Sequence, residues 1–165
     1  MIKLKVTKVT KENFKNFGQF MYIPAEGEFI PTNQAAFFKF YGGMGLMDCH
    51  GITELGICTF KKRPLETSEL EQHAGTPELL YALDGDFMMP IAPIIYQNGA
   101  SCPDVSRAMA IRVNQYEGVI FNDGIWHWAP FPLQETSSVI VGFKKDTALT
   151  DILIKDIGDK IVMEV

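Results

Sequence analysis

Histidine is scarce in this chain of 165 residues, and only three are present: His50, His73 and His127. A site that needs several imidazoles must therefore draw on these three. Cys49 precedes His50, but neighbouring residues on a strand face opposite ways, which argues against a nucleophile and base in that pair. We therefore assign His50 no chemical role.

Paired cysteines, a signal segment and a membrane span are also missing. The three cysteines lie apart and form no C-x-x-C motif, namely Cys49, Cys58 and Cys102, whereas a secreted domain of this size more often carries paired cysteines. The N-terminus has no uninterrupted apolar signal region. The longest uncharged stretch, 87–103, is broken by prolines and too short to cross a bilayer. These absences predict a cytoplasmic protein with reduced thiols and no membrane contact.

A basic patch is lacking as well. The chain carries 15 Lys and Arg against 20 Asp and Glu, a formal net charge of -5, which argues against nucleic acid as a partner. The glycine-rich segment 42–45 lacks the lysine and the spacing of a phosphate-binding loop, so we expect no nucleotide cofactor. No linker or repeat divides the sequence, and 47% hydrophobic residues suffice for one core, which predicts a single domain over residues 1–165.

Short segments rich in aromatic and β-branched residues recur along the chain at regular spacing. The expected strands cover residues 2–6, 19–23, 35–41, 52–60, 78–83, 86–95, 107–113, 118–121, 137–143, 152–154 and 161–165. Thr10 is typical of the N-cap of a short helix that ends at Gly18. Asp84-Gly85 predicts a tight hairpin, and Pro90 and Pro93 predict an edge or a bulge in its second arm. The pattern favours an all-β sandwich or barrel.

The first segment that suggests chemistry is Glu71-Gln72-His73, followed by four residues and then Glu78. On an extended segment Glu71 and His73 point to the same face, and Glu78 opens the next expected strand. An imidazole with carboxylates suits a divalent metal or an acid–base pair. Two structural alternatives remain open. Ser68–Glu71 fits a helical capping box, which we favour for Glu71 alone, and His73 with Glu78 fits an exposed pair beside a turn.

The second segment runs from Gly118 to His127, where a strand enters an Asn-Asp-Gly turn and returns with a histidine between Trp126 and Trp128. Its apolar neighbours suit the wall of a ligand pocket. The structural alternative is a packed, hydrogen-bonded histidine of the core.

Together the two segments resemble the two motifs of the cupin superfamily. The first motif normally reads His-x-His, three or four residues, Glu, and a hydrophobic strand that ends in Gly; residues 71–85 follow it with Glu71 in place of the first histidine. The second normally reads Gly, five residues, Pro-x-Gly-x-x-His; residues 118–127 resemble it, with three residues in place of five after Gly118 and Asn122 in place of the proline. The resemblance implies an all-β, jelly-roll-like barrel with one or two short helices, and a homodimer.

The chain is similar more specifically to the ureidoglycolate lyase family, which is built on a cupin barrel. The segments that carry this likeness are Phe14–Gly18, Glu71–His73, Pro103–Ser106, Gly118–Val119, Trp126–His127 and Pro130–Leu133. The likeness covers nearly the whole chain and is densest over residues 64–143. One departure is Glu78-Leu79-Leu80, where the family has Gln, Ala and Phe.

This resemblance implies an enzyme that cleaves ureidoglycolate, a small anion, to glyoxylate and urea in allantoin and purine breakdown. Expelling urea needs a base on the hydroxyl and an acid at the departing nitrogen, roles that Glu78 with His73 or His127 can divide. The expected substrate-binding residues are Glu71, Trp126 and Lys144. The other cations that could hold the substrate carboxylate are Lys62, Arg63 and Arg112.

Glu78 also restores the acidic ligand of a metal-binding cupin. We therefore expect His73, Glu78 and His127, joined by Glu71, to hold a divalent metal such as Mn, Zn or Fe. Such a site leaves two other functions open. One is a metal-dependent isomerase or epimerase of a sugar or hydroxy acid, and the other is a non-catalytic cupin that binds a small molecule.

Overall fold

The computed structural model describes all residues from 1 to 165, and most of them lie in strands. The helices are short, namely α1 (Lys11–Phe14), η1 (Val105–Arg107) and α2 (Thr147–Thr150). The strands are β1 (Ile2–Lys8), β2 (Gly18–Met21), β3 (Asn33–Ala35), β4 (Phe38–Phe40), β5 (Thr53–Lys61), β6 (Glu66–Gln72), β7 (Glu78–Ala82), β8 (Phe87–Ala92), β9 (Ile94–Gln97), β10 (Ala100–Pro103), β11 (Met109–Val113), β12 (Gly118–Phe121), β13 (Trp126–His127), β14 (Phe131–Pro132), β15 (Thr136–Lys144) and β16 (Leu153–Glu164). The all-β prediction is therefore confirmed. None of the helices has the length and apolarity that crossing a membrane requires.

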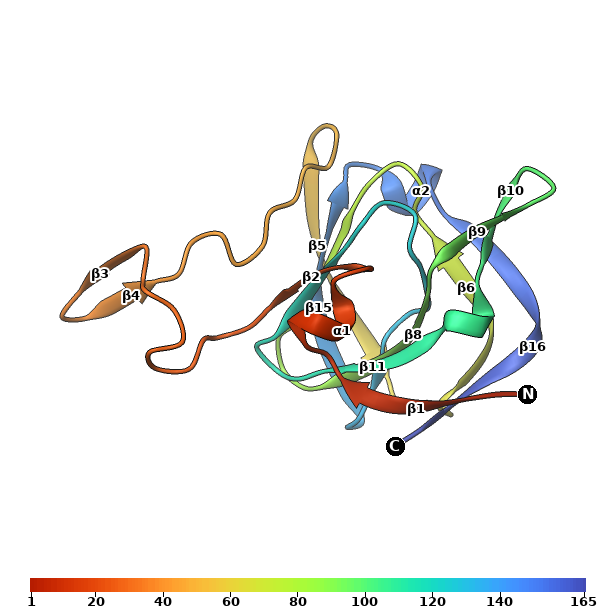
Figure 1. The fold of residues 1–165 in the computed structure, drawn as a ribbon, viewed down its shortest axis with the longest axis horizontal. Coiled ribbons are helices and arrows are strands. Elements are labelled where there is room, and N and C mark those ends of the chain that lie inside the picture. Colours follow the sequence, from red (N-terminus) through yellow and green to blue (C-terminus); the bar gives the residue numbers. More distant parts are fainter.

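Two sheets form the body of the molecule (Figure 1). The larger sheet has the strand order β11-β1-β16-β6-β13-β8-β14, and an additional pairing of β8 with β11 closes the strands from β11 to β8 into a barrel, with β14 outside the ring. This barrel is mixed, because β1 runs parallel to both of its neighbours, β11 and β16. The smaller sheet has the order β2-β12-β7-β15-β5 and is antiparallel throughout.

Strand β8 separates two hydrophobic cores. Met88 and Ala92 belong to the cluster inside the closed barrel, whereas Phe87, Met89 and Ile91 belong to the cluster between β8 and the smaller sheet. Because alternate side chains of a strand point to opposite faces, every residue of β8 is buried. This double burial explains why β8 is a continuous apolar run in the sequence.

The predicted hairpin around Asp84-Gly85 is wrong. Strand β7 pairs with β12 and β15 in the smaller sheet, while β8 lies in the larger one, so residues 83–86 carry the chain from one sheet to the other. Oδ1 of Asp84 accepts a hydrogen bond from the backbone N–H of Ser138 on β15 at 2.5 Å. The carboxylate of Asp86 accepts one from Arg112 on β11 at 2.5 Å. The two aspartates thus hold opposite ends of the crossing to different sheets.

The expectation that Pro90 marks an edge or a bulge is also wrong, because β8 is a central strand with β11 on one side and β13 and β14 on the other. Proline lacks the N–H that a central strand normally donates. The carbonyl of Pro90 accepts from the backbone N–H of Trp128, which lies between β13 and β14. The missing donor therefore faces the place where the neighbouring strand is interrupted.

Three smaller differences concern where elements end. Thr10 caps α1 in a capping box with Asn13, as its type predicts, but α1 ends at Phe14 and not near Gly18. The expected strand 35–41 is a hairpin of β3 and β4 joined by a turn at residues 36–37. The expected strands 152–154 and 161–165 are one strand, β16, interrupted by a register shift between Asp156 and Ile161.

The chain between β2 and β5 leaves the body of the molecule as an arm, with the β3–β4 hairpin at its far end (Figure 1). The arm returns to the smaller sheet at Leu46. There the side-chain amide of Gln19 on β2 donates to the carbonyl of Leu46 at 2.6 Å and accepts from its N–H at 3.0 Å. The base of the arm is therefore fixed to the sheet.

Candidate active site

A cavity of about 320 Å³ opens between the smaller sheet and the ends of β6 and β13. Nine of its 15 lining residues are hydrophobic and form most of its wall. Its ionisable side chains are Cys58, Glu71, His73, Glu78 and His127. No Lys or Arg lines the cavity. The structure thus brings together the three residues that the sequence nominates for catalysis, with Glu71 beside them.

Strand pairing places Glu71 and His127 on the same face of the larger sheet. His127 on β13 lies directly opposite Glu71 on β6 in antiparallel register, and side chains of directly opposite residues are neighbours. The adjacent residues, Leu70 and Trp126, point the other way and are buried in the barrel core. The capping-box interpretation of Glu71 is therefore wrong, because residues 66–72 form a strand and not a helix start.

The turn between β12 and β13 is tied to the chain around His73. The N–H of Gly124 donates to the carbonyl of His73 at 2.8 Å, and the carbonyl of Gly124 accepts from the side chain of Gln72 at 2.5 Å. Gly124 has a φ of 73°, and a Cβ there would lie 2.9 Å from the Ile94 side chain, so the turn requires glycine. These contacts hold His73 and His127 close, with ring centroids 5.4 Å apart.

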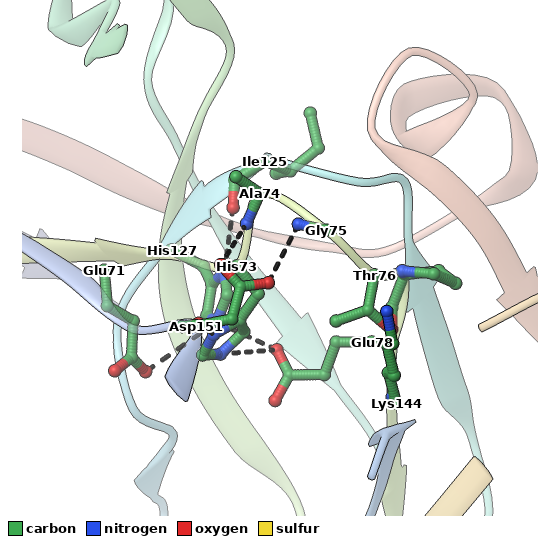
Figure 2. Close-up of polar contacts among 11 residues, drawn as sticks. Glu71, His73, Ala74, Gly75, Thr76, Glu78, Ile125, His127, Lys144 and Asp151 are labelled. Carbon is green, nitrogen blue, oxygen red and sulfur yellow. Dashed lines mark hydrogen bonds and ion pairs between the residues drawn. The ribbon is translucent and has the colours of Figure 1, made fainter. Parts of the chain in front are cut away.

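Both imidazoles are oriented by backbone carbonyls. Nδ1 of His73 lies 2.6 Å from the carbonyl oxygen of Asp151, and Nδ1 of His127 lies 3.0 Å from that of Ile125. A carbonyl oxygen only accepts, so each Nδ1 carries a proton. In both rings Nε2 is then the atom that faces the carboxylates (Figure 2). The ring of His127 also stacks on Phe121, with an interplanar angle of 6°.

Two carboxylates approach His127 from opposite sides (Figure 2). Nε2 of His127 lies 2.9 Å from Oε2 of Glu78 and 3.7 Å from Oε1 of Glu71. The same oxygen of Glu78 lies 3.9 Å from Nε2 of His73. Glu78 is the first residue of β7, as expected, so the smaller sheet supplies one carboxylate and the larger sheet supplies the other.

The charges of this cluster move its pKa values apart. Burial alone would lower the pKa of His127, but the carboxylates of Glu78 and Glu71 outweigh burial and raise that pKa to about 9. Burial alone would raise the pKa of Glu78, but the charges of His127 and His73 outweigh it and lower that pKa. Burial and the nearby charge of Glu78 raise the pKa of Glu71. Without a metal, His127 is therefore protonated and Glu78 ionised at neutral pH.

The donor set fits a divalent metal. Ligand atoms of Glu71, His73 and His127 all lie within 4.8 Å of one another. The Nδ1 atoms of the two histidines carry protons and donate to backbone carbonyls, an arrangement common to metal-bound histidines. Oε2 of Glu78 is buried and, although close to His127, makes no hydrogen bond of good geometry, so it has capacity for another partner. The sequence predicted Glu78 as the carboxylate ligand beside His73 and His127. In the structure the carboxylate that belongs to this group of three is that of Glu71, and Glu78 lies outside it.

Trp126 does not line the cavity, contrary to the expectation that it binds substrate. Its side chain is fully buried in the barrel core, and its indole N–H donates to Ser101 at 3.3 Å. The reason is the alternation of β13: when His127 points into the cavity, Trp126 must point into the barrel.

The four expected cations lie outside the cavity. Lys144 is exposed, and only its backbone N–H contacts the loop before β7, where it donates to Thr76 at 3.0 Å. Arg63 does not line the cavity, but it donates to the carbonyls of Ala129 and Pro130, two residues that do. The other two form ion pairs elsewhere: Lys62 with Glu135, and Arg112 with Asp86. His50 is also remote and pairs with Asp123 at 2.8 Å.

One residue that sequence reasoning missed is Asp151. Besides its carbonyl contact with His73, its carboxylate accepts from the N–H groups of Ala74 at 3.1 Å and Gly75 at 2.8 Å. Asp151 therefore holds both the ring of His73 and the loop that follows it. No sequence motif predicts this role, because the contact joins residues that are 78 positions apart in the chain.

Among solved structures, the chain is similar to oxalate decarboxylases. A Bacillus subtilis oxalate decarboxylase studied for its Mn(II) centers is 16% identical, with 62% of this chain and 24% of that chain covered and a TM-score of 0.42. One studied for proton-coupled electron transfer is 16% identical, with 58% and 22% covered and a TM-score of 0.43. The Bacillus subtilis enzyme at pH 4.6 is 18% identical, with 58% and 22% covered and a TM-score of 0.40. The chain spans about a quarter of the length of these proteins.

Comparison of sequences identifies the family. No curated protein matches the chain. The family model described as ureidoglycolate lyase matches residues 1–156, which include every element that lines the cavity. A match over nearly the entire chain, together with an all-β barrel and a Glu-His-Glu-His cavity, leads to one conclusion: the chain belongs to the ureidoglycolate lyase family.

Proposed function

We propose that this protein cleaves ureidoglycolate to glyoxylate and urea. The observation that carries the proposal is the buried contact of Glu78 with His127 in the cavity of a ureidoglycolate lyase family member. A buried carboxylate and imidazole whose pKa values are displaced in opposite directions form a base and an acid in one site.

The reaction needs one proton to move from oxygen to nitrogen. Loss of the hydroxyl proton lets the carbon–oxygen double bond of glyoxylate form while the carbon–nitrogen bond breaks. The departing urea nitrogen takes up a proton, so nothing is oxidised or reduced. Glu78, which stays ionised, is placed to accept the hydroxyl proton, and His127, which stays protonated, is placed to donate to the nitrogen. Glu71 and Asp151 position the two imidazoles.

A metal-bound form of the same site is supported by a second observation. Ureidoglycolate carries a carboxylate, yet no Lys or Arg lines the cavity. A divalent ion such as Mn, Zn or Fe, held by Glu71, His73 and His127, would supply the missing positive charge and polarise the substrate oxygens. A ligand nitrogen carries no proton, so in this form His127 no longer serves as the acid. Glu78 then both accepts the proton and returns it.

The test is to incubate ureidoglycolate with purified protein and measure glyoxylate, both after chelation and after addition of Mn, Zn or Fe. We expect release above the spontaneous rate, and its loss in H127A. The matched control is His50→Asn, which changes a histidine outside the cavity. No release under any metal condition would overturn the proposal. Stabilisation of the protein by small acids would then favour a non-catalytic binding protein, and turnover of a sugar or hydroxy acid would favour an isomerase or epimerase.

We also propose that the protein is a cytoplasmic homodimer with a small anionic substrate. Three separate free cysteines support a reducing compartment. Large hydrophobic side chains that remain exposed on the single chain support association.

A further inference from the structure

A separate cavity of about 340 Å³ opens between the ribbon of β9 and β10 and the strand β16. It shares no lining residue with the candidate active site. Two side chains with nucleophilic atoms line it, Cys102 on β10 and Lys155 on β16. Neither has a part in the proposed reaction, so this pair needs an explanation of its own.

The register of β16 explains why the two side chains meet. Lys155 lies directly opposite Leu70 on β6, and side chains of directly opposite residues share a face of the sheet. Leu70 is buried in the barrel core, so the side chain of Lys155 is also directed inward. The ribbon of β9 and β10 lies beside β16 at this point (Figure 1) and brings Cys102, which is 6% exposed, to the end of the lysine side chain.

The amine and the thiol are in direct contact. Nζ of Lys155 lies 2.7 Å from Sγ of Cys102. A lysine ammonium only donates, so the sulfur accepts this hydrogen bond. The thiol itself donates to the carbonyl of Ala100 at 3.7 Å. The polar side chain that Lys155 contacts is thus a thiol and not a carboxylate.

This contact favours oxidation at the sulfur. The thiolate is the form of cysteine that reacts, and a neighbouring positive charge stabilises it. The cavity leaves one side of the pair open to a small oxidant. A cysteine that reacts with peroxide becomes a sulfenic acid, which condenses with a nearby thiol or nitrogen. No second cysteine contacts Cys102, whereas the nitrogen of Lys155 does.

We infer that hydrogen peroxide joins Cys102 to Lys155 through a sulfur–nitrogen bond that thiols reverse. In the first step the thiolate takes one oxygen from peroxide: the S–O bond forms, the O–O bond breaks and hydroxide leaves. Sulfur is oxidised by two electrons, and peroxide is reduced. In the second step the nitrogen of Lys155 bonds to sulfur and the S–O bond breaks. The ammonium gives one proton to the hydroxide and one to the departing oxygen, so two water molecules are released.

The new bond would tie the ribbon to β16 across 53 positions of the chain. A cross-link of this span restricts the unfolded chain, so the oxidised protein should be harder to unfold. We expect the midpoint of thermal unfolding to rise by about 5–10 °C and to return after treatment with dithiothreitol. Neither the cross-link nor this rise rests on the proposed function.

The test treats the wild-type protein with hydrogen peroxide, digests it with trypsin and measures the peptide masses. The peptide that contains Cys102 should be joined to the one that contains Lys155, with the loss of two hydrogen atoms. Cleavage after Lys155 should disappear, because trypsin needs a free lysine side chain. Dithiothreitol should separate the two peptides and restore the cleavage.

Two lysine variants separate the bond from the charge. Lys155→Arg keeps a positive charge beside the sulfur, but a guanidinium stays protonated and does not form the bond. In this variant Cys102 should stop at the sulfenic acid, which dimedone traps. The matched control is Lys160→Arg, which changes an exposed lysine on the same strand that pairs with Glu66; it should form the cross-link as wild type does.

Cys58, which is exposed and lines the other cavity, is the reference thiol in the same digest. A Cys102 that stays reduced at a peroxide dose that oxidises Cys58 would overturn the inference. So would a wild-type Cys102 that gains oxygen while trypsin still cleaves after Lys155. The peptide masses do not depend on activity, so a cross-linked protein that releases no glyoxylate would overturn only the proposed function.

Discussion

Nε2 of His127 lies 2.9 Å from Oε2 of Glu78, and both side chains are buried. The two residues belong to different sheets, since His127 is on β13 and Glu78 begins β7. The contact therefore forms only when the two sheets close on each other. The hydrophobic core between the two sheets fixes their relative position. The distance between His127 and Glu78 therefore depends on how that core packs.

Replacing Glu78 by glutamine should abolish the proton transfer and lower the pKa of His127. Gln keeps the size of the side chain but cannot accept a proton, so kcat should fall about 10²–10⁴-fold. The negative charge of Glu78 helps to raise the pKa of His127 to about 9. Without that charge, the pKa of His127 should fall. Glyoxylate release and NMR titration of the metal-free protein measure the two effects. Glu66→Gln, on the exposed part of β6, is the control; an unchanged His127 titration in the Glu78 variant would contradict the ion pair.

Removing the Asp151 carboxylate should disturb His73 without touching substrate. Asp151→Ala deletes the acceptor of the Ala74 and Gly75 N–H groups, so the loop that holds the imidazole should loosen. We expect about a 10–100-fold loss of activity or metal affinity, the usual effect of a residue that orients a ligand. Asp151→Asn keeps one acceptor oxygen and should recover part of the loss. Thr150→Ala is the neighbouring control, and an equal loss there would argue against this role.

Trp126 variants separate a core role from substrate binding. Trp126→Ala should lower the free energy of unfolding by about 3–5 kcal/mol, because it empties a large volume in the barrel core. Trp126→Phe retains most of the buried apolar surface, so its KM for ureidoglycolate should equal that of wild type. Urea denaturation and steady-state kinetics make the comparison. A raised KM in a fully folded Trp126→Phe protein would show that the side chain reaches the substrate after all.

Metal binding should depend on Glu71 and His73 as well as His127. After chelation, calorimetry should show uptake of one Mn, Zn or Fe ion per chain with release of protons, because ligand groups lose their protons when they bind. Glu71→Gln should weaken binding by at least about 10-fold. The control His50→Asn should bind as wild type does. Substoichiometric metal that is unchanged in His127→Ala would exclude the metal-bound form.

Acid should remove the stabilising contribution of Asp84. A hydrogen bond from the backbone N–H of Ser138 lowers the pKa of this carboxyl in the folded protein. Its contribution is therefore present above the unfolded pKa of about 3.9 and is lost as the pH falls through the lower, folded pKa. The stability advantage of wild type over Asp84→Asn should shrink between pH 7 and pH 3 in urea unfolding. Glu26→Gln, on the exposed arm, should show no such convergence.

Residue types and local spacing were sufficient to predict several features. Alternation along the chain indicated an all-β protein, and Thr10 indicated the start of α1. The spacing of Glu71, His73, Glu78 and His127 nominated residues that the structure does bring together. These predictions succeed because strand alternation and capping are local properties, encoded within a few residues.

Other features depended on which strands meet. Asp84-Gly85 has the composition of a hairpin turn, but β7 and β8 are each paired with strands that lie far away in the sequence. Pro90 is tolerated in a central strand only because its neighbour is interrupted there. The choice of partners depends on burying two cores at once, and no short window of sequence contains that information.

The sequence by itself determined the set of chemical groups: two imidazoles and two carboxylates in two motifs, each on a strand or at its end. Only the tertiary structure decided which way they point and what surrounds them. It placed Trp126 in the core, the expected cations outside the cavity, and Asp151 behind His73. The physical reason is that pairing between distant strands sets the face and the neighbours of each side chain. The pKa of a buried group follows from those neighbours.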